Sequence, residues 1–118
     1  MGTTGDGSLW ASRIYINCIG DRTDEIKFVH STHSYASTRL TDIEISEGTR
    51  QPLYFYSFRG LLAENIVNHI FERLADNNFE DDGVTPAPAI TITIGAENLN
   101  KLTDEQKAIA TDKNYILA

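Results

Sequence analysis

The segment that decides the fold is LLAENIVNHIFERLADN, residues 61–77. Its apolar side chains recur at the spacing that places them on one side of an α-helix, while charged and amide side chains fall on the other. The apolar positions are Leu62, Ile66, Val67, Ile70, Phe71 and Leu74. This pattern predicts one long amphipathic helix from Leu61 to Asp76 that packs against a sheet.

Several other segments alternate between apolar and polar residues, as β-strands do. The clearest is AITITIG, residues 89–95, in which the isoleucines point inward and the threonines outward. TDIEIS, residues 41–46, places Asp42 and Glu44 on an outer row, which favours a sheet face open to water. The remaining predicted strands are RIYINCI (13–19), EIKFVHS (25–31), PLYFYSF (52–58) and NYILA (114–118).

Turn residues separate these strands, and Thr103-Asp-Glu-Gln106 has the spacing of a helix capping box, which predicts a short C-terminal helix. We therefore expect an α+β fold: a mainly antiparallel sheet of about five to six strands with one long amphipathic helix packed on it and a short C-terminal helix. Residues 1–12 are expected to form a flexible leader, and residues 13–118 a single α+β domain.

The charge of the chain limits its partners. Its net charge is −7, and Lys and Arg are scattered among more numerous acids, so direct binding to nucleic-acid phosphates is not expected. No stretch approaches the ~18 apolar residues of a membrane span, and residues 1–10 lack the features of a secretory signal. The single cysteine, Cys18, fits a reducing compartment. We expect a cytoplasmic, soluble protein with a basic protein partner.

FVHSTHS, residues 28–34, contains two of the three histidines of the chain, His30 and His33. On a continuous strand this spacing places them on opposite faces, whereas a bulge or turn could bring them together. A metal or acid/base site would then need a further ligand, such as His69, and no CxxC or HExxH motif supplies one. The metal-site hypothesis therefore rests on His30 and His33 alone.

The acidic run DNNFEDDG, residues 76–83, invites comparison with a calcium-binding loop. An EF-hand loop requires Gly at its sixth position and Glu at its twelfth, where this chain has Asp81 and Ala87. We interpret the run as a solvated acidic loop after the helix. The chain also has no glycine-rich phosphate loop or nucleophile elbow, so no cofactor is expected.

The aromatic segment YFYSFR, residues 54–59, carries tyrosines beside an arginine, a combination enriched in protein interfaces. Aromatic residues also fill hydrophobic cores, so this segment could form either part of an interface or part of the core. The predicted partner-binding residues combine this segment with exposed acids: Tyr54, Tyr56, Arg59, Asp42, Glu44, Glu80, Asp81 and Asp82.

Four runs, IYINCIG (14–20), EIKFVHSTHSY (25–35), DIEISEGT (42–49) and FYSFRG (55–60), resemble the opening strands of aegerolysin-like β-sandwich proteins. Those are small, acidic, single-domain proteins that associate with lipid or with a partner toxin. The resemblance covers about half of the chain, includes no specific motif and implies a β-sandwich without the helix predicted at residues 61–76. It is an alternative interpretation, from which no functional residues are transferred.

These features favour a small acidic, non-enzymatic binding or regulatory protein that acts through protein–protein contact, as inhibitors and immunity proteins do. Three alternatives stay open. The first is a metal-dependent or acid/base enzyme that uses His30 and His33, although the absence of a catalytic motif weighs against an enzyme. The second is an aegerolysin-like protein that binds lipid or a toxin. The third is a homo-oligomeric structural component that pairs through an exposed edge strand.

Overall fold

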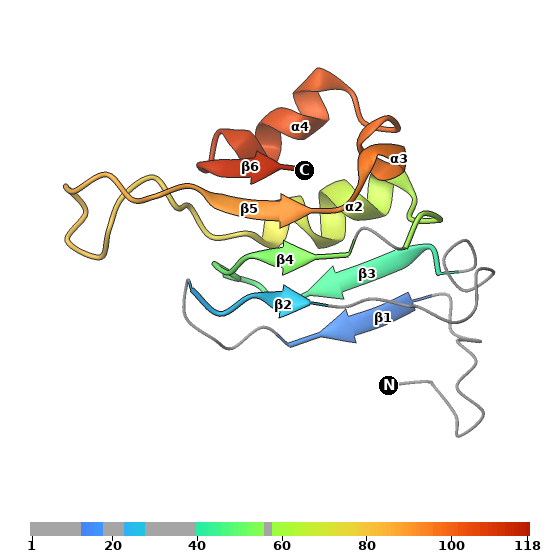
Figure 1. Ribbon diagram of the computed structural model, residues 1–118, viewed down its shortest axis with the longest axis horizontal. Coiled ribbons are helices and arrows are strands. Elements are labelled where there is room, and N and C mark those ends of the chain that lie inside the picture. The colour runs from blue at the N-terminus through green and yellow to red at the C-terminus, as the bar shows by residue number, and fades with distance from the viewer. Residues whose placement is uncertain (1–12, 18–22, 28–39, 56–57) are drawn as a thin grey trace.

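The computed structural model describes residues 13–17, 23–27, 40–55 and 58–118, and these form two small sheets with helices (Figure 1). Strands β1 and β3 form a two-stranded sheet, and β2, β4, β5 and β6 form a four-stranded sheet in that order. The strands are β1 (Arg13–Ile16), β2 (Ile26–Lys27), β3 (Asp42–Ile45), β4 (Leu53–Tyr54), β5 (Ile90–Thr93) and β6 (Tyr115–Leu117). The helices are α2 (Ala63–His69), the 3₁₀ helix η1 (Phe71–Arg73), α3 (Ala96–Leu99) and α4 (Asp104–Thr111).

The prediction of a mainly antiparallel sheet is wrong, because every pair of neighbouring strands in the described part of the chain is parallel. The sequence predicts that the turns near residues 20 and 48 fold each strand back onto its predecessor. Instead β2 lies in a different sheet from β1, and β4 lies in a different sheet from β3, so β1 pairs with β3 and β2 pairs with β4. Helices then carry the chain from β4 to β5 and from β5 to β6, as parallel pairing requires.

The prediction of one long helix from Leu61 to Asp76 is also wrong. Helix α2 ends at His69, Ile70 leaves the helical conformation with φ −120°, and one turn of η1 follows. Leu74 then forms a parallel bridge with Thr49, and backbone bonds from Gly48 N to Arg73 O (2.8 Å) and from Ala75 N to Thr49 O (2.8 Å) flank it. Strand-type bonding at these backbone groups competes with the helical bonds that would continue α2.

Three local predictions are confirmed. In β5 and the residue after it, Ile90, Ile92 and Ile94 are buried while the two threonines are partly exposed. The capping box forms at the start of α4, where Gln106 N donates to Thr103 Oγ1 at 3.1 Å and Thr103 N donates to Gln106 Oε1 at 2.9 Å. The C-terminal segment forms an edge strand, β6.

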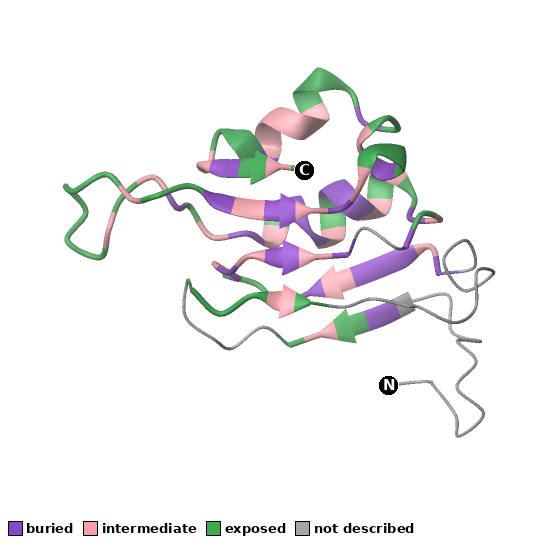
Figure 2. Ribbon diagram, in the orientation of Figure 1, coloured by how far each residue is buried: buried purple, intermediate pink, exposed green. Residues whose placement is uncertain are grey.

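One hydrophobic core joins both sheets and α2. Figure 2 shows its buried residues concentrated on β3, β4, β5 and α2, with exposed residues along the loop that precedes β5. Fully buried residues such as Phe55, Phe58 and Phe71 fix the helices against the sheets. In the described part of the chain, no helix is long and apolar enough to cross a membrane.

Candidate partner-binding site

A β-hairpin projects from the molecule between η1 and β5, at the left of Figure 1. We call residues 78–87 the acidic hairpin. Its two arms meet at an antiparallel bridge between Phe79 and Pro86, and Gly83 turns the chain with φ +71°, a conformation that glycine adopts most readily. Three backbone hydrogen bonds close it: Glu80 N to Thr85 O (2.7 Å), Gly83 N to Glu80 O (2.9 Å) and Ala87 N to Asn78 O (3.2 Å).

Asn77 fastens the base of the acidic hairpin to the body of the protein. Its side chain is fully buried, and Nδ2 donates to Pro88 O at 2.9 Å and to Asn114 O at 3.3 Å. Asn114 in turn donates from Nδ2 to Asn77 O (2.9 Å) and Ala87 O (3.0 Å). The two asparagines thus hold both arms of the hairpin against the turn that precedes β6.

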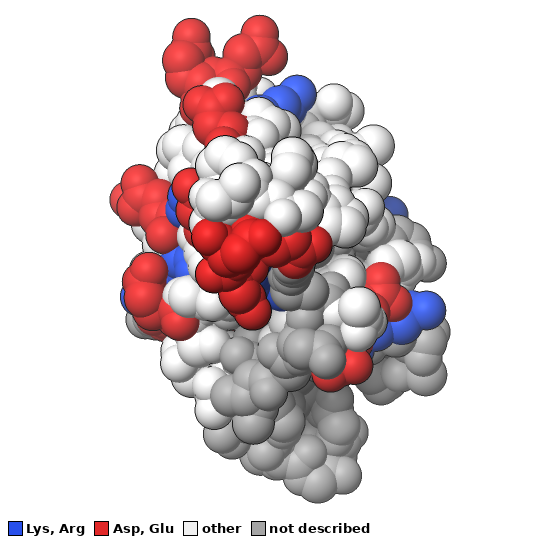
Figure 3. Space-filling model, turned by 90° about the vertical axis from the view of Figure 1, so that its left-hand side faces the viewer, with Lys and Arg blue, Asp and Glu red and all other residues white. Residues whose placement is uncertain are grey.

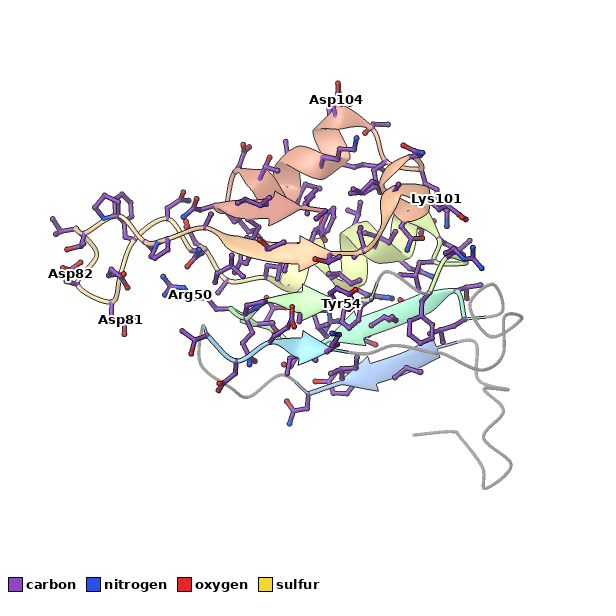
Figure 4. All side chains as sticks on the ribbon, in the orientation of Figure 1. Arg50, Tyr54, Asp81, Asp82, Lys101 and Asp104 are labelled. Atoms are coloured by element: carbon purple, nitrogen blue, oxygen red, sulfur yellow. The ribbon has the colours of Figure 1, made fainter. Side chains whose placement is uncertain are left out.

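Arg50 braces the same base from the segment before β4, and Figure 4 shows its side chain directed toward the hairpin. Its Nε donates to Asn77 Oδ1 at 2.9 Å, and its NH2 group donates to the carbonyl of Phe79. NH1 lies 3.6 Å from a carboxylate oxygen of Asp81, whose side chain is fully exposed. The guanidinium fork therefore positions the hairpin mainly through its two hydrogen bonds, because an exposed ion pair contributes little.

The Asp82 carboxylate organises the turn itself. Oδ1 accepts from Val84 N and Thr85 N, both at 2.8 Å, and Oδ2 accepts from the Thr85 hydroxyl at 2.6 Å. The Thr85 hydroxyl, followed by the Thr85 and Val84 amides, lowers the pKa of Asp82 from 3.8 to about 2. Asp82 was predicted as a partner-binding residue, and its carboxylate oxygens are engaged within the hairpin.

The titration of Asp82 gives a first prediction. The charged carboxylate favours the folded turn at pH values above 3.8, and this contribution is lost as the pH falls through about 2. We expect the Val84 and Thr85 amide resonances to titrate near pH 2 in an NMR series, and Thr85→Val to move that midpoint upward. Asp82→Asn, which cannot ionise, should abolish the step, whereas a midpoint near 3.8 in the unaltered protein would contradict it.

The outer surface of the acidic hairpin combines apolar and acidic side chains. Phe79 is 50% exposed and Val84 76% exposed, although both are apolar. Glu80 and Asp81 lie beside them along the chain. Figure 3 looks onto the end of the molecule from which the hairpin projects, and carboxylates there outnumber Lys and Arg. This end is therefore a negatively charged surface with exposed apolar side chains.

The predicted partner-binding residues Asp42 and Glu44 lie elsewhere, on the row of β3 that faces α2 and η1. Asp42 is buried, and both of its carboxylate oxygens contact His69 Nδ1, at 2.8 and 2.9 Å. Glu44 Oε2 lies 2.8 Å from Arg73 NH2, and Asn65 Nδ2 donates to Thr41 O at 3.1 Å. The predicted water-facing row of β3 is thus covered by polar side chains of α2 and η1, and both acids are engaged by these side chains.

The aromatic segment contributes two described candidates. Tyr54 lies on β4, in the middle of the four-stranded sheet, with Lys27 Nζ 4.7 Å from its ring centroid. Arg59 NH1 lies 3.5 Å from Glu97 Oε1 in an exposed pair. Tyr56 lies outside the described residues. Figure 4 shows Tyr54 on the sheet, away from Asp81 and Asp82 at the far end of the acidic hairpin.

The two residues of the metal-site hypothesis, His30 and His33, lie outside the described residues. Within residues 13–17, 23–27, 40–55 and 58–118, no group of three or more His, Cys, Asp or Glu side chains is placed to hold a metal ion. The contact between His69 and Asp42 fixes the orientation of the imidazole, and with the Arg73–Glu44 pair it fastens α2 and η1 to β3.

Sequence reasoning identified the acids of the hairpin but missed the residues that shape it, Arg50, Asn77, Phe79 and Val84. From the sequence, Pro86 and Pro88 are equally consistent with a loop that leads into a strand, because proline has no backbone N–H to donate. Acidic turn residues between an exposed aromatic residue and a proline-rich return arm are a signal that could have indicated a projecting hairpin. The contact between Arg50 and Asn77 spans 27 residues and has no local sequence signature.

No protein-family model, curated protein or solved structure matches the chain. The parallel sheets also differ from the β-sandwich of antiparallel sheets that the resemblance to aegerolysin-like proteins implies.

Proposed function

We propose that the chain is a non-enzymatic protein-binding protein that inserts its acidic hairpin into a cleft with a basic rim on a partner protein. The observation that carries the proposal is a projecting hairpin held by Asn77 and Arg50 that presents Phe79 and Val84 to solvent. Apolar side chains at the centre of an interface with charged residues around them are the usual arrangement of binding hot spots.

The fixed geometry of the hairpin supports binding. An interface element that is already ordered loses less conformational entropy when the complex forms. Asn77 and Asn114 hold the base, and Asp82 holds the turn through three hydrogen bonds. A convex, ordered element of this kind fits a concave site, which is how inhibitor-like proteins occupy their targets.

Contact through side chains is favoured over the addition of a strand. Pro86 and Pro88 have no backbone N–H to offer a neighbouring strand, and the carbonyl of Phe79 already accepts a hydrogen bond from Arg50. The partner therefore meets Phe79 and Val84 as side-chain anchors.

The net charge of −7 supports the proposal that the rim of the partner's cleft is basic. Glu80 and Asp81 place negative charge beside the apolar anchors, so a basic rim on the partner would accelerate association. Such binding weakens as salt concentration rises, because the charges on the rim are exposed and screened.

The proposal predicts that binding depends on the hairpin anchors. Native mass spectrometry of the protein purified from its own host at low salt should detect a basic protein in complex. The double variant Phe79→Ala/Val84→Ser should bind that protein about 10- to 100-fold more weakly, as expected for the loss of interface anchors. Raising the salt concentration should weaken the unaltered complex further.

A matched control uses two exposed apolar residues that lie outside the acidic hairpin. Leu62 and Ile116 are each 53% exposed, and Leu62→Ala/Ile116→Ser should bind like the unaltered protein. If the control pair weakens the complex while the hairpin pair leaves it intact, the acidic hairpin is not the binding element. If no complex is retained at low salt, the proposed function is wrong.

A further inference from the structure

We propose that Asp82 is a site of isoaspartate formation and that the closed turn of the acidic hairpin protects it. The reaction is a spontaneous rearrangement in which an aspartate and the next residue form a succinimide ring that water reopens. Gly83 follows Asp82, and glycine hinders this ring closure least because it has no side chain. Figure 4 places Asp82 at the far end of the acidic hairpin, where it is exposed to water. The inference goes beyond the proposed function and does not depend on it.

The reaction joins the side chain of Asp82 to its own backbone. The Gly83 nitrogen forms a bond with Cγ of the protonated Asp82 carboxyl, and the amide hydrogen and the carboxyl hydroxyl leave together as water. Water then adds to one of the two carbonyl carbons of the ring. Addition at Cγ restores aspartate, whereas addition at the main-chain carbonyl carbon of Asp82 leaves the chain running through Cγ, which is isoaspartate. Water is the only co-reactant.

Both reacting groups are already engaged in the folded hairpin. Gly83 N donates to Glu80 O at 2.9 Å, so the attacking nitrogen must first give up this bond. The oxygen that leaves as water is either Oδ1 or Oδ2 of Asp82. Oδ1 accepts from the Val84 and Thr85 amides at 2.8 Å, and Oδ2 accepts from the Thr85 hydroxyl at 2.6 Å. The turn must therefore open before the ring can close.

The ionisation of Asp82 protects it in the same way. Ring closure uses the protonated carboxyl, and the Thr85 hydroxyl, followed by the Thr85 and Val84 amides, lowers the pKa of Asp82 to about 2. At neutral pH the closed turn thus holds the side chain in its unreactive, charged form. The rate at Asp82 should equal the rate in the unfolded chain multiplied by the fraction of molecules in which the turn is open.

The product could not rebuild the same turn. Isoaspartate carries its free carboxylate on the α-carbon and adds one methylene carbon to the backbone between residues 82 and 83. The carboxylate that accepts from Val84 and Thr85 would be displaced, while the bridge between Phe79 and Pro86 fixes the length of the turn. Isoaspartate at position 82 would therefore alter the end of the hairpin that carries Val84.

The test compares the rate at Asp82 when the turn is closed, weakened and absent. The full-length protein is incubated at neutral pH, either folded or unfolded in guanidinium chloride, and isoaspartate is located by peptide mapping with electron-transfer fragmentation. Thr85→Val removes the hydroxyl but keeps the shape, so it should accelerate the reaction in the folded protein about 5- to 10-fold. Thr85→Ser keeps the hydroxyl and should stay within about twofold of the unaltered protein. Unfolding should accelerate the reaction at least as much as Thr85→Val does.

The sequence supplies an internal control, because Asp6–Gly7 is its only other Asp–Gly pair. The rate at Asp6 should be the same in the unaltered protein and in both Thr85 variants, so that a change confined to Asp82 reports on the turn. Hydrogen exchange of the Val84 and Thr85 amides measures opening independently. Their protection in the unaltered protein should match the slowing at Asp82, relative to guanidinium chloride, within about threefold.

The comparison with hydrogen exchange uses the unaltered protein alone, so it holds even if Thr85→Val does not fold. Equal rates at Asp82 in the folded and the unfolded protein would overturn the inference, and so would equal rates in the two Thr85 variants. Absence of isoaspartate at Asp82 after unfolding would show that the site itself is wrong.

Discussion

Replacing Asn77 by alanine is expected to lower the free energy of unfolding by about 2–4 kcal/mol and to weaken any complex that the acidic hairpin forms. The fully buried Asn77 side chain accepts from Arg50 Nε at 2.9 Å and donates to Pro88 O at 2.9 Å and Asn114 O at 3.3 Å. The alanine variant would leave these groups without their partner at the point where the hairpin joins the sheet. Urea denaturation followed by circular dichroism measures the loss.

Two further variants make the Asn77 result specific. Asn77→Asp keeps the shape of the side chain but replaces the donor Nδ2 by an oxygen that faces two carbonyl groups, so it should destabilise the protein at least as much as alanine does. Asn68→Ala alters an exposed asparagine on α2 and should be as stable as the unaltered protein or slightly more so. Equal stability of Asn77→Ala and Asn68→Ala would show that the hairpin is not fastened in this way.

Asn98→Ala is expected to have a larger effect, a loss of about 3–5 kcal/mol. Asn98 is fully buried on α3, and its Nδ2 donates to Phe58 O and Ile94 O, both at 2.8 Å. Its Oδ1 accepts from Lys101 Nζ at 2.9 Å. One side chain thus joins the end of β5 to the loop between β4 and α2, and its removal leaves buried polar groups unpaired together with a cavity.

Lys101 extends the same network and allows a double-mutant cycle. Its Nζ also donates to Arg59 O at 2.7 Å and Leu61 O at 2.6 Å, and burial lowers the pKa of its amine while Glu97 acts in the opposite direction. Because Lys101 and Asn98 share this network, the effects of Asn98→Ala and Lys101→Met should be less than additive. The exposed neighbour Asn100, changed to alanine, is the control. A value for Asn98→Ala within about 1 kcal/mol of this control would contradict the role assigned to Asn98.

Local features of the fold could be predicted from the sequence, and the pairing of the strands could not. The alternation at Ile90, Ile92 and Ile94 identified β5, and Thr103 with Gln106 identified the start of α4, because each pattern is contained within a few residues. The choice between antiparallel neighbours and parallel strands in two sheets depends on where each turn directs the chain. The amino-acid composition near residues 20 and 48 predicts a turn but does not indicate which sheet the next strand joins.

The end of α2 illustrates the same limit. The apolar pattern continues through Phe71 and Leu74, and both are buried as predicted. The helix nevertheless ends at His69, because the backbone on either side of Leu74 bonds with Thr49 and Gly48. Helical periodicity reports which side chains are buried, and tertiary hydrogen bonds decide where the helix stops.

For the candidate site, the sequence identified the acidic residues but did not indicate which of them have a structural role and which are proposed to face a partner. Asp42 and Asp82 were both predicted to contact a partner. Asp42 is buried against His69, and Asp82 holds its own turn. Only the packing of α2 on β3 and the conformation of the hairpin distinguish these carboxylates from Glu80 and Asp81.

The alternation of strands between the two sheets has a consequence for folding. During synthesis, β1 leaves the ribosome before its partner β3, and β2 before its partner β4. The two-stranded sheet therefore cannot pair until β3 has emerged, and the four-stranded sheet cannot begin to pair until Tyr54 has emerged. Parallel pairs between distant segments form slowly, because closing the intervening loops costs entropy before contacts compensate for it. We expect nascent chains that end before residue 54 to be protease-sensitive, and folding to complete only when the C-terminal strand has been released.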